Sequence, residues 1–361
     1  MHLFTDQPGD EGLPGHERRL AMAAVMTSTT MAVFDGSMVN IALPHIARVL
    51  EISSGDAVWI ANGYLLSAAM TLAIFAALAP RTGFRALFAA GISLFTLASL
   101  GCALSTSLEM LVAMRLLQGI GGAATLSIAP AILRSIFPGR LLGRILGIHA
   151  LLIAANTAIA PVVGGALLAS FGWQWLFAIN LPFGVIALLL TLRVVPAHRA
   201  RMNGRFDVAG ALFSAMMLGA VIMASNAFSR PGESGGTLLT PALYGLAAVV
   251  SGIAFIYRQR RAAHPLVPLA LFSSARFSLA ALTSLSSFVS QGMTFVALPF
   301  LFQSVYGYSA FTSALLFTAW PVGIVLVAPH AGRLADRYAP VVISTAGLRS
   351  EEHTSELQSL Q

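Results

Sequence analysis

Long apolar segments, each of about 20 residues, recur from residue 20 nearly to residue 330. A run of this length crosses a hydrocarbon core of about 30 Å as one α-helix, whereas a membrane β-barrel would show short alternating segments. The composition agrees, since 57% of the residues are hydrophobic and 10% are charged, against about a quarter charged in soluble domains. The sequence therefore predicts an all-α polytopic membrane protein.

The apolar segments and the polar turns between them predict ten transmembrane helices. We expect these helices at residues 20–43, 58–79, 86–104, 109–132, 143–169, 174–195, 207–227, 239–257, 277–301 and 310–330. Ten spans would place both ends of this helical region on the same side of the membrane.

The basic residues, all 21 of which are arginines, are distributed unevenly between the two sides. The connections on one side carry Arg18, Arg19, Arg81, Arg85, Arg134, Arg140, Arg144, Arg193, Arg199, Arg201, Arg205, Arg258, Arg260, Arg261, Arg276, Arg333 and Arg337. Those on the other side carry Arg48 and Arg230. By the positive-inside rule, the arginine-rich side and the amino terminus are cytoplasmic, in a bacterial inner membrane. Topology thus explains the basic charge, and no nucleic-acid partner is expected.

A short internal sequence repeat indicates the domain organisation. The segment Ala76–Arg81 after the second predicted helix is echoed by Gly332–Arg337 after the tenth, as parallel repeats in a transporter would require. We therefore expect a cytoplasmic amino terminus at 1–19, a six-helix bundle at 20–195, an inserted helix pair with loops at 196–260, and the start of a carboxyl-terminal bundle at 261–348.

The segment 349–361 is polar and unlike the rest of the chain. Its string resembles the translation of a common sequencing-adapter oligonucleotide. We therefore expect the native sequence to stop near Leu348 and the tail to carry no function. An ordinary polar cytoplasmic tail is the alternative.

Asp35 in 20–43 and Arg115 in 109–132 are charged residues that lie deep inside predicted spans, away from the span ends. At a rise of about 1.5 Å per residue both lie about 10–12 Å from the outer helix ends, so a direct or water-mediated ion pair is feasible. A carboxylate at mid-membrane costs about 2.5–3.5 kcal/mol, which favours a partnered, proton-exchanging Asp35. The alternatives are a static pair that orients helices, and an Arg115 clamp onto backbone carbonyls.

The segment Pro161–Gly165 in the fifth predicted helix combines proline with two glycines. Proline removes a backbone hydrogen bond, and small residues let helices approach closely, so this is a candidate bending and packing point. Ordinary packing of glycine and proline in a membrane helix is the alternative.

Few residues here suit catalysis or metal binding. The single cysteine, Cys102, has no partner for a disulfide, and His149 has no second histidine or carboxylate near it in sequence. Without a nucleophile and base or a metal constellation, we expect neither an enzyme, nor a metal site, nor a cofactor.

These segments resemble, in order, the 14-helix drug:proton antiporter family of the major facilitator superfamily. The first helix is similar to the family's Leu-Asp-x-Thr-x-Val-Asn-x-Ala-Leu-Pro signature, carried here by Asp35, Val39, Asn40, Ala42, Leu43 and Pro44. Residues 173–184 are similar to its Trp-Arg-Trp-x-Phe-x-Ile-Asn-x-Pro-x-Gly. Further matches are Trp59, Ile60, Tyr64, Leu65, Arg115, Gln118, Gly119, Gln303, Gly307, Ser309, Pro321 and Gly332–Arg337.

The resemblance implies a multidrug efflux protein, associated with antibiotic resistance, that exchanges a periplasmic proton for a hydrophobic or amphipathic compound by alternating access. Asp35 and Arg115 would couple the proton, and Pro161, Gly164 and Gly165 would control antiport. The cytoplasmic gate loops would use Arg81, Gly83, Arg85, Gly332, Asp336 and Arg337, while candidate polar groups of the substrate cavity are Asn40, Tyr64, Gln118 and Asn180.

The expected partners are a small-molecule substrate, protons and the lipid bilayer, and the participation of a membrane-fusion partner stays open. The alternative functions are export of a specific metabolite, such as a siderophore or an amino acid, and an inactive truncated fragment.

Two segments depart from the family pattern. In the first gate loop, Pro80 stands where the family has an aspartate and Ala76 where it has a glycine, which weakens the charge latch expected there. In the fifth helix, Asn156 and Ala160 stand where the family has glycines, which alters how that helix is expected to flex.

Overall fold

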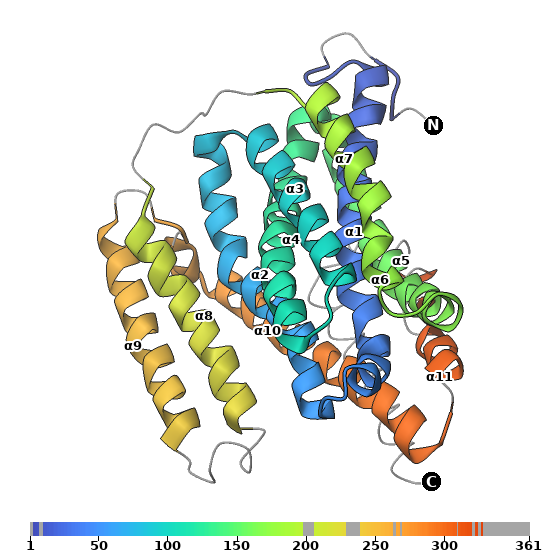
Figure 1. The fold of residues 1–361 in the computed structure, drawn as a ribbon. Coiled ribbons are helices and arrows are strands. Elements are labelled where there is room, and N and C mark those ends of the chain that lie inside the picture. Colours follow the sequence, from blue (N-terminus) through green and yellow to red (C-terminus); the bar gives the residue numbers. More distant parts are fainter. Residues whose placement is uncertain are drawn as a thin grey trace.

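The computed structural model describes residues 3–6, 10–197, 206–228, 239–262, 265–267, 269–308, 310–319, 322–323 and 326–327, and every element in these ranges is helical (Figure 1). The first elements are α1 (Gly15–Val49), α2 (Ser54–Thr82), α3 (Phe84–Ala103), α4 (Leu108–Ile136), α5 (Gly139–Ser170), α6 (Trp175–Ala178) and α7 (Asn180–Val194). They are followed by α8 (Val208–Phe228), α9 (Leu239–Arg261), the 3-10 turn η1 (Leu269–Ser273), α10 (Ala275–Phe300), the π-helical turn η2 (Leu301–Val305) and α11 (Ala310–Phe317).

Seven helical segments among the described residues are long and apolar enough to cross a membrane. They are Gly55–Thr82, Phe84–Ala103, Leu108–Ile136, Gly139–Ser170, Trp175–Val194, Val208–Phe228 and Leu239–Arg261. The all-helical membrane fold is therefore confirmed, while the total of ten spans stays a prediction. The predicted tail at 349–361 lies outside the described residues.

Local sequence signals place several helix ends. Ser53 caps α2 by accepting a 3.0 Å hydrogen bond from the Asp56 amide, and Ser107 caps α4 by accepting one of 3.3 Å from the Met110 amide. Gly83, between α2 and α3, has φ 97°, a left-handed conformation that only glycine adopts readily. The chain can therefore reverse direction there within one residue.

The span predicted at residues 174–195 corresponds to the apolar helical segment Trp175–Val194, which contains one interruption. The helix is interrupted at Ile179, between α6 and α7. Pro182 explains the break, because it has no amide hydrogen to donate to the carbonyl one turn earlier, yet it fits the first turn of α7. Helix α1 begins at Gly15, so it extends beyond the amino-terminal end of the span predicted at 20–43.

The amino-terminal helices form one bundle in which α4 packs against both α2 and α3, and α1 packs against α5 and α7 (Figure 1). Close packing depends on glycine: a Cβ on Gly121 of α4 would lie 2.6 Å from the backbone nitrogen of Phe95 in α3. One apolar cluster, which includes Val25, Phe88 and Ile132, fills one end of the bundle. A second, which includes Met38, Ile60 and Leu176, fills the other end.

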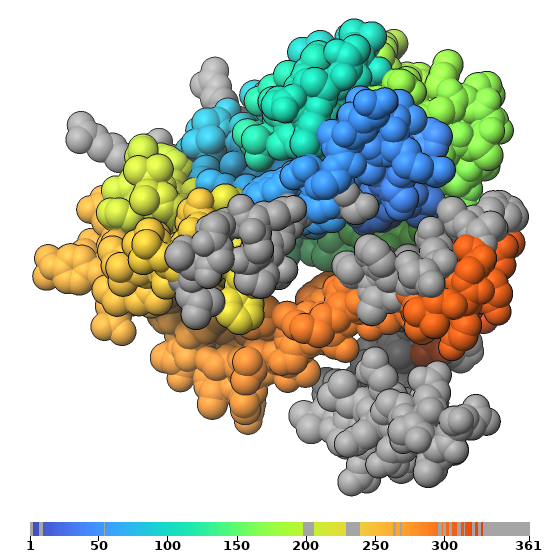
Figure 2. Space-filling model, turned by 60° about the horizontal axis from the view of Figure 1, so that its bottom comes forward, coloured from blue at the N-terminus to red at the C-terminus, as the bar shows by residue number. Residues whose placement is uncertain are grey.

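Helices α8 and α9 pair with each other and contact the bundle through α2 (Figure 1). Asp207, just before α8, accepts hydrogen bonds from the Gly210 amide at 3.1 Å and from Nε of Arg258 at 2.9 Å, which fixes the ends of the two helices together. Figure 2 shows α10 as an exposed strip below the amino-terminal helices, and its apolar side chains, such as Phe288 and Met293, are exposed.

Candidate functional site

Asp35 lies in α1 between the two apolar clusters, and its side chain is 0% exposed. Its Oδ2 pairs directly with Nη1 of Arg115 from α4. Its Oδ1 accepts hydrogen bonds from Nε2 of Gln118 at 2.8 Å and from Nδ2 of Asn180, at the start of α7, at 3.0 Å. Three helices therefore meet at one carboxylate. We call Asp35, Arg115, Gln118, Asn180 and Tyr64 the polar centre.

The Arg115 side chain is held by hydrogen bonds and by contacts with aromatic rings. Its Nε donates to the carbonyl of Ile60 in α2 at 2.9 Å, and its Nη1 also donates to Oε1 of Gln118 at 2.7 Å. Its guanidinium carbon lies 4.5 Å from the ring centroid of Tyr64 and 5.7 Å from that of Phe177. Stacking on aromatic faces and forked hydrogen bonding both suit a guanidinium better than an ammonium group.

Gln118 connects the charge pair to α3. Its Nε2 donates to Oγ of Ser99 at 2.8 Å, and Sγ of Cys102 lies 3.7 Å from its Oε1. Sequence reasoning did not single out Ser99, and it assigned no role to Cys102. Neither residue is charged or belongs to the motifs that predicted the site, so no sequence signal pointed to a role for these two positions.

The burial of the pair has an energetic consequence. A buried ion pair persists when further hydrogen bonds satisfy both groups, and removing one partner costs about 3–5 kcal/mol because it leaves an unpaired buried charge. Asp35 has three side-chain donors here and Arg115 has three acceptors. The polar centre is therefore stable as an intact set and is sensitive to any change in the charge of Asp35.

Of the four predicted cavity residues, three lie together in the polar centre and one lies elsewhere. Tyr64, Gln118 and Asn180 are buried in the polar centre, where the Tyr64 hydroxyl also donates to the carbonyl of Ala32 at 3.3 Å. Asn40 is exposed, and its amide donates only to the carbonyl of Gly36 in its own helix, at 3.4 Å.

The predicted antiport segment of α5 packs on α1. Pro161 and Gly164 are buried, and a Cβ on Gly164 would lie 3.1 Å from the side chain of Met38. A Cβ on Gly165 would meet no described atom within 4 Å. Asn156, which replaces a family glycine, donates a 2.9 Å hydrogen bond to Oγ1 of Thr30 in α1.

The first predicted gate loop uses its arginines on backbone and aromatic partners. Arg81 donates to the carbonyl of Ala77 and lies 5.7 Å from the ring centroid of Phe206. Arg85 donates to the carbonyl of Leu192 at the end of α7. Gly332, Asp336 and Arg337 of the second gate loop lie outside the described residues. A search of the described residues finds no cluster of three or more metal-binding side chains.

Comparisons with known proteins agree on a family. Residues 25–348 match the Major Facilitator Superfamily. The chain is 38% identical to the uncharacterized transporter YebQ of Escherichia coli (strain K12), over 94% of this chain and 73% of that protein. It is 27% identical to the riboflavin transporter RibZ of Clostridioides difficile (strain 630), over 91% and 71% of the two proteins.

Two further comparisons extend this result. The chain is 31% identical to the multidrug resistance protein Stp of Mycobacterium tuberculosis (strain ATCC 25618 / H37Rv), over 91% of this chain and 61% of that protein. The crystal structure of the peptide transporter POT in complex with sulfate shares the fold, with a TM-score of 0.60 at 15% identity, over 94% of this chain and 72% of that one. The chain therefore belongs to the Major Facilitator Superfamily, a family of multi-pass membrane transporters.

Proposed function

We propose that this protein is a proton-coupled exporter of hydrophobic or amphipathic compounds, of the 14-helix drug:proton antiporter type, with its amino terminus in the cytoplasm. The observation that carries the proposal is the buried carboxylate of Asp35 in α1, which is paired with Arg115 of α4 and also bonded to Gln118 of α4 and Asn180 of α7. An ionisable group at that depth is costly, and in membrane transporters such groups mark proton and substrate pathways.

The proposed chemistry is a proton exchange on Asp35. Protonation from the periplasmic side removes the negative charge, so the charge-assisted bonds from Arg115, Gln118 and Asn180 weaken together. Arg115 keeps its contacts with the Ile60 carbonyl and Tyr64. Helix α1 is then released from α4 and α7, which lets the bundle exchange between outward and inward packings. Loss of the proton to the cytoplasm restores the charge pair.

The remaining predicted residues take supporting roles in this proposal. Pro161 and Gly164 let α5 pack and bend against α1 as access alternates. Gly165 adds no side chain next to this contact, which leaves space for the bending of α5. The loop with Arg81, Gly83 and Arg85 closes the cytoplasmic side with the loop of Gly332, Asp336 and Arg337. We place these parts in a six-helix bundle at 20–195, an inserted pair at 196–260 and a second bundle from 261.

One of these relatives supports a drug as substrate, since Stp is a multidrug resistance protein. The alternative is a specific metabolite. RibZ supports this alternative, because it is a riboflavin transporter of comparable similarity. Asp35 and Arg115 would couple a proton to either substrate.

The test uses the full chain in proteoliposomes with an imposed pH gradient, and it compares ethidium with riboflavin. Wild type should move ethidium in the direction opposite to protons. Asp35→Asn keeps the shape and the acceptor of the side chain, so it should fold while losing at least nine tenths of the proton-driven flux. Asp56→Asn, which also removes one carboxylate, is the control and should retain it.

Full proton-driven ethidium flux by folded Asp35→Asn, at the expression level of wild type, would contradict the proposal. Proton-driven riboflavin flux without ethidium flux would replace the drug substrate by a metabolite and leave the role of Asp35 in place. An absence of flux for both compounds and for a panel of antibiotics would favour the inactive fragment.

A further inference from the structure

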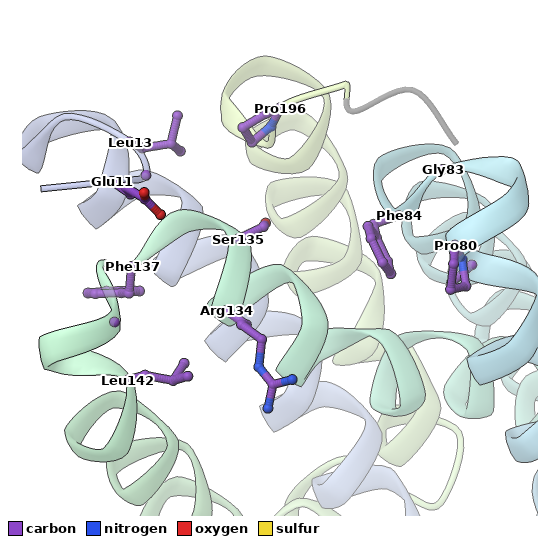
Figure 3. A pocket seen from close by; sticks show the side chains of 13 residues that line it. Glu11, Leu13, Pro80, Gly83, Phe84, Arg134, Ser135, Phe137, Leu142 and Pro196 are labelled. Atoms are coloured by element: carbon purple, nitrogen blue, oxygen red, sulfur yellow. The ribbon is translucent and has the colours of Figure 1, made fainter. Parts of the chain in front are cut away.

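A cavity of about 570 Å³ lies at the end of the bundle where α2, α4 and α7 end and α3 and α5 begin (Figure 3). In the proposed orientation this end faces the cytoplasm. Small-molecule sites typically have volumes of about 300–1,000 Å³ and are mostly apolar with a few polar groups. Figure 3 shows Pro80 and Phe84 on one side of this cavity and Phe137 and Leu142 on the other. The volume therefore suits a small organic ligand, and the lining offers it both apolar and polar groups.

The amino-terminal segment before α1 forms part of the cavity wall through residues 11–13. It is anchored to the bundle, because the Leu13 amide donates a 3.1 Å hydrogen bond to the carbonyl of Ile136. Arg18, which is 1% exposed, donates to the carbonyls of Leu13 and Leu3 and pairs with Asp6. These hydrogen bonds and this ion pair therefore fix the amino-terminal part of the cavity wall to the bundle.

The cavity holds two charged side chains of opposite sign, Arg134 from α4 and Glu11 from the amino-terminal segment. Both are exposed. Within the part of the chain that the structure describes, neither side chain makes a hydrogen bond or an ion pair. Figure 3 shows the Arg134 side chain directed between the apolar walls. A guanidinium with free donors, next to aromatic and aliphatic surface, is suited to a carboxylate, sulfonate or phosphate on an apolar body.

We propose that this cavity binds an amphipathic anion, with the anionic group on Arg134 and the apolar body between Phe84 and Phe137. This inference is independent of the exported substrate. The bound anion bridges the end of α2, which carries Pro80 and is followed by Gly83, and the connection after α4, which carries Phe137. Occupancy therefore holds these two parts of the bundle together and restrains their relative movement.

The test measures binding of 4-phenylbutyrate to the purified full chain in phosphatidylcholine nanodiscs by calorimetry, with empty nanodiscs as the blank. The matched ligands are 4-phenylbutylamine and 4-phenyl-1-butanol, which carry the same apolar body with a positive charge and with no charge. The anion should bind saturably and at least tenfold more tightly than either of the other two. A second series in nanodiscs that contain phosphatidylglycerol identifies the source of the anion: competition indicates a lipid headgroup, and its absence a soluble anion.

Two pairs of variants locate the site. Arg134→Gln should weaken binding of 4-phenylbutyrate at least tenfold, whereas Arg144→Gln, an equal charge change at an exposed position outside the cavity, should not. Gly139→Phe should fill the cavity and abolish binding, whereas Gly143→Phe, on the same helix but outside the lining, should not. A Cβ at either glycine meets no described atom within 4 Å, so both variants are expected to fold.

Three results would overturn the proposal. One is the absence of saturable binding of 4-phenylbutyrate to wild type. Another is equal binding of the anion, the amine and the alcohol, which would indicate partition into an apolar surface. The third is binding by Arg134→Gln and Gly139→Phe at the affinity of their control variants, which would place the anion elsewhere.

Discussion

Gln118 of α4 donates a 2.8 Å hydrogen bond to the carboxylate of Asp35 in α1. The same amide group accepts from Arg115 at 2.7 Å, so one uncharged side chain bridges both members of the buried charge pair. Its Nε2 also reaches Ser99 of α3. Gln118 thus transmits any change in the charge of Asp35 to a third helix, which makes it the first residue to test after the pair itself.

Replacing Gln118 by leucine should lower the melting temperature of the purified protein. The change leaves Ser99 without its donor and takes one partner from both Asp35 and Arg115, and each buried group left unsatisfied costs about 1–3 kcal/mol. Thermal unfolding in detergent measures the effect. Ser127→Ala on the same helix is the control, because Ser127 bonds only to the Ala124 carbonyl of its own helix. Equal melting temperatures for the two variants would refute the bridging role.

Arg115→Lys should abolish proton-driven transport although it keeps the positive charge. Lysine cannot reproduce the bond from Nε to the Ile60 carbonyl together with the bonds from Nη1, and it loses the planar stack on Tyr64. We expect at least a tenfold loss of flux in proteoliposomes. Arg144→Lys, at an exposed position, should transport like wild type. Normal transport by Arg115→Lys would mean that a positive charge at this position is sufficient for proton coupling.

Gly121→Ala should destabilise the bundle. The added methyl group would lie 2.6 Å from the backbone nitrogen of Phe95 and 2.8 Å from the carbonyl oxygen of Gly91, and backbone atoms cannot move aside as a flexible side chain can. Overpacking of this kind costs about 1–3 kcal/mol. Gly147→Ala meets no described atom within 4 Å and should be neutral or slightly stabilising, since alanine favours helix. The yield of monodisperse protein and its melting temperature provide the measurement. A lower melting temperature for Gly147→Ala than for Gly121→Ala would refute the close contact between α3 and α4.

Asn156 and Thr30 should show a favourable coupling between α5 and α1. Their 2.9 Å hydrogen bond is worth about 0.5–1.5 kcal/mol. A double-mutant cycle of Asn156→Ala and Thr30→Val, measured by unfolding, isolates this energy because it cancels the effects of each single change. Additive effects would show that asparagine at this family glycine position does not tie the helices together.

Part of this site could be predicted from the sequence. Asp35 and Arg115 are charged residues deep inside predicted spans, and the helical rise placed them at similar depths. A direct ion pair between them could therefore be anticipated. The helical class and the approximate positions of the described spans also follow from hydropathy alone.

The partners of the pair could not be predicted from the sequence. Asn40 and Asn180 both lie in family-like segments, yet Asn180 bonds to Asp35 while Asn40 is exposed. The difference depends on the rotation of α1 and on the break at Ile179, which tertiary packing sets. The cavity beside residues 11–13 could not be predicted from the sequence either, because this part of its wall belongs to a polar segment with no periodic pattern.

The measurement that tests the central claim most directly is proton release from the purified protein on addition of substrate, followed with a pH indicator in weakly buffered detergent solution. If Asp35 carries the coupled proton, wild type and Asp56→Asn should release protons when a transported compound is added, and Asp35→Asn should release none. Equal release by Asp35→Asn and wild type would contradict the assignment of Asp35 as the proton carrier.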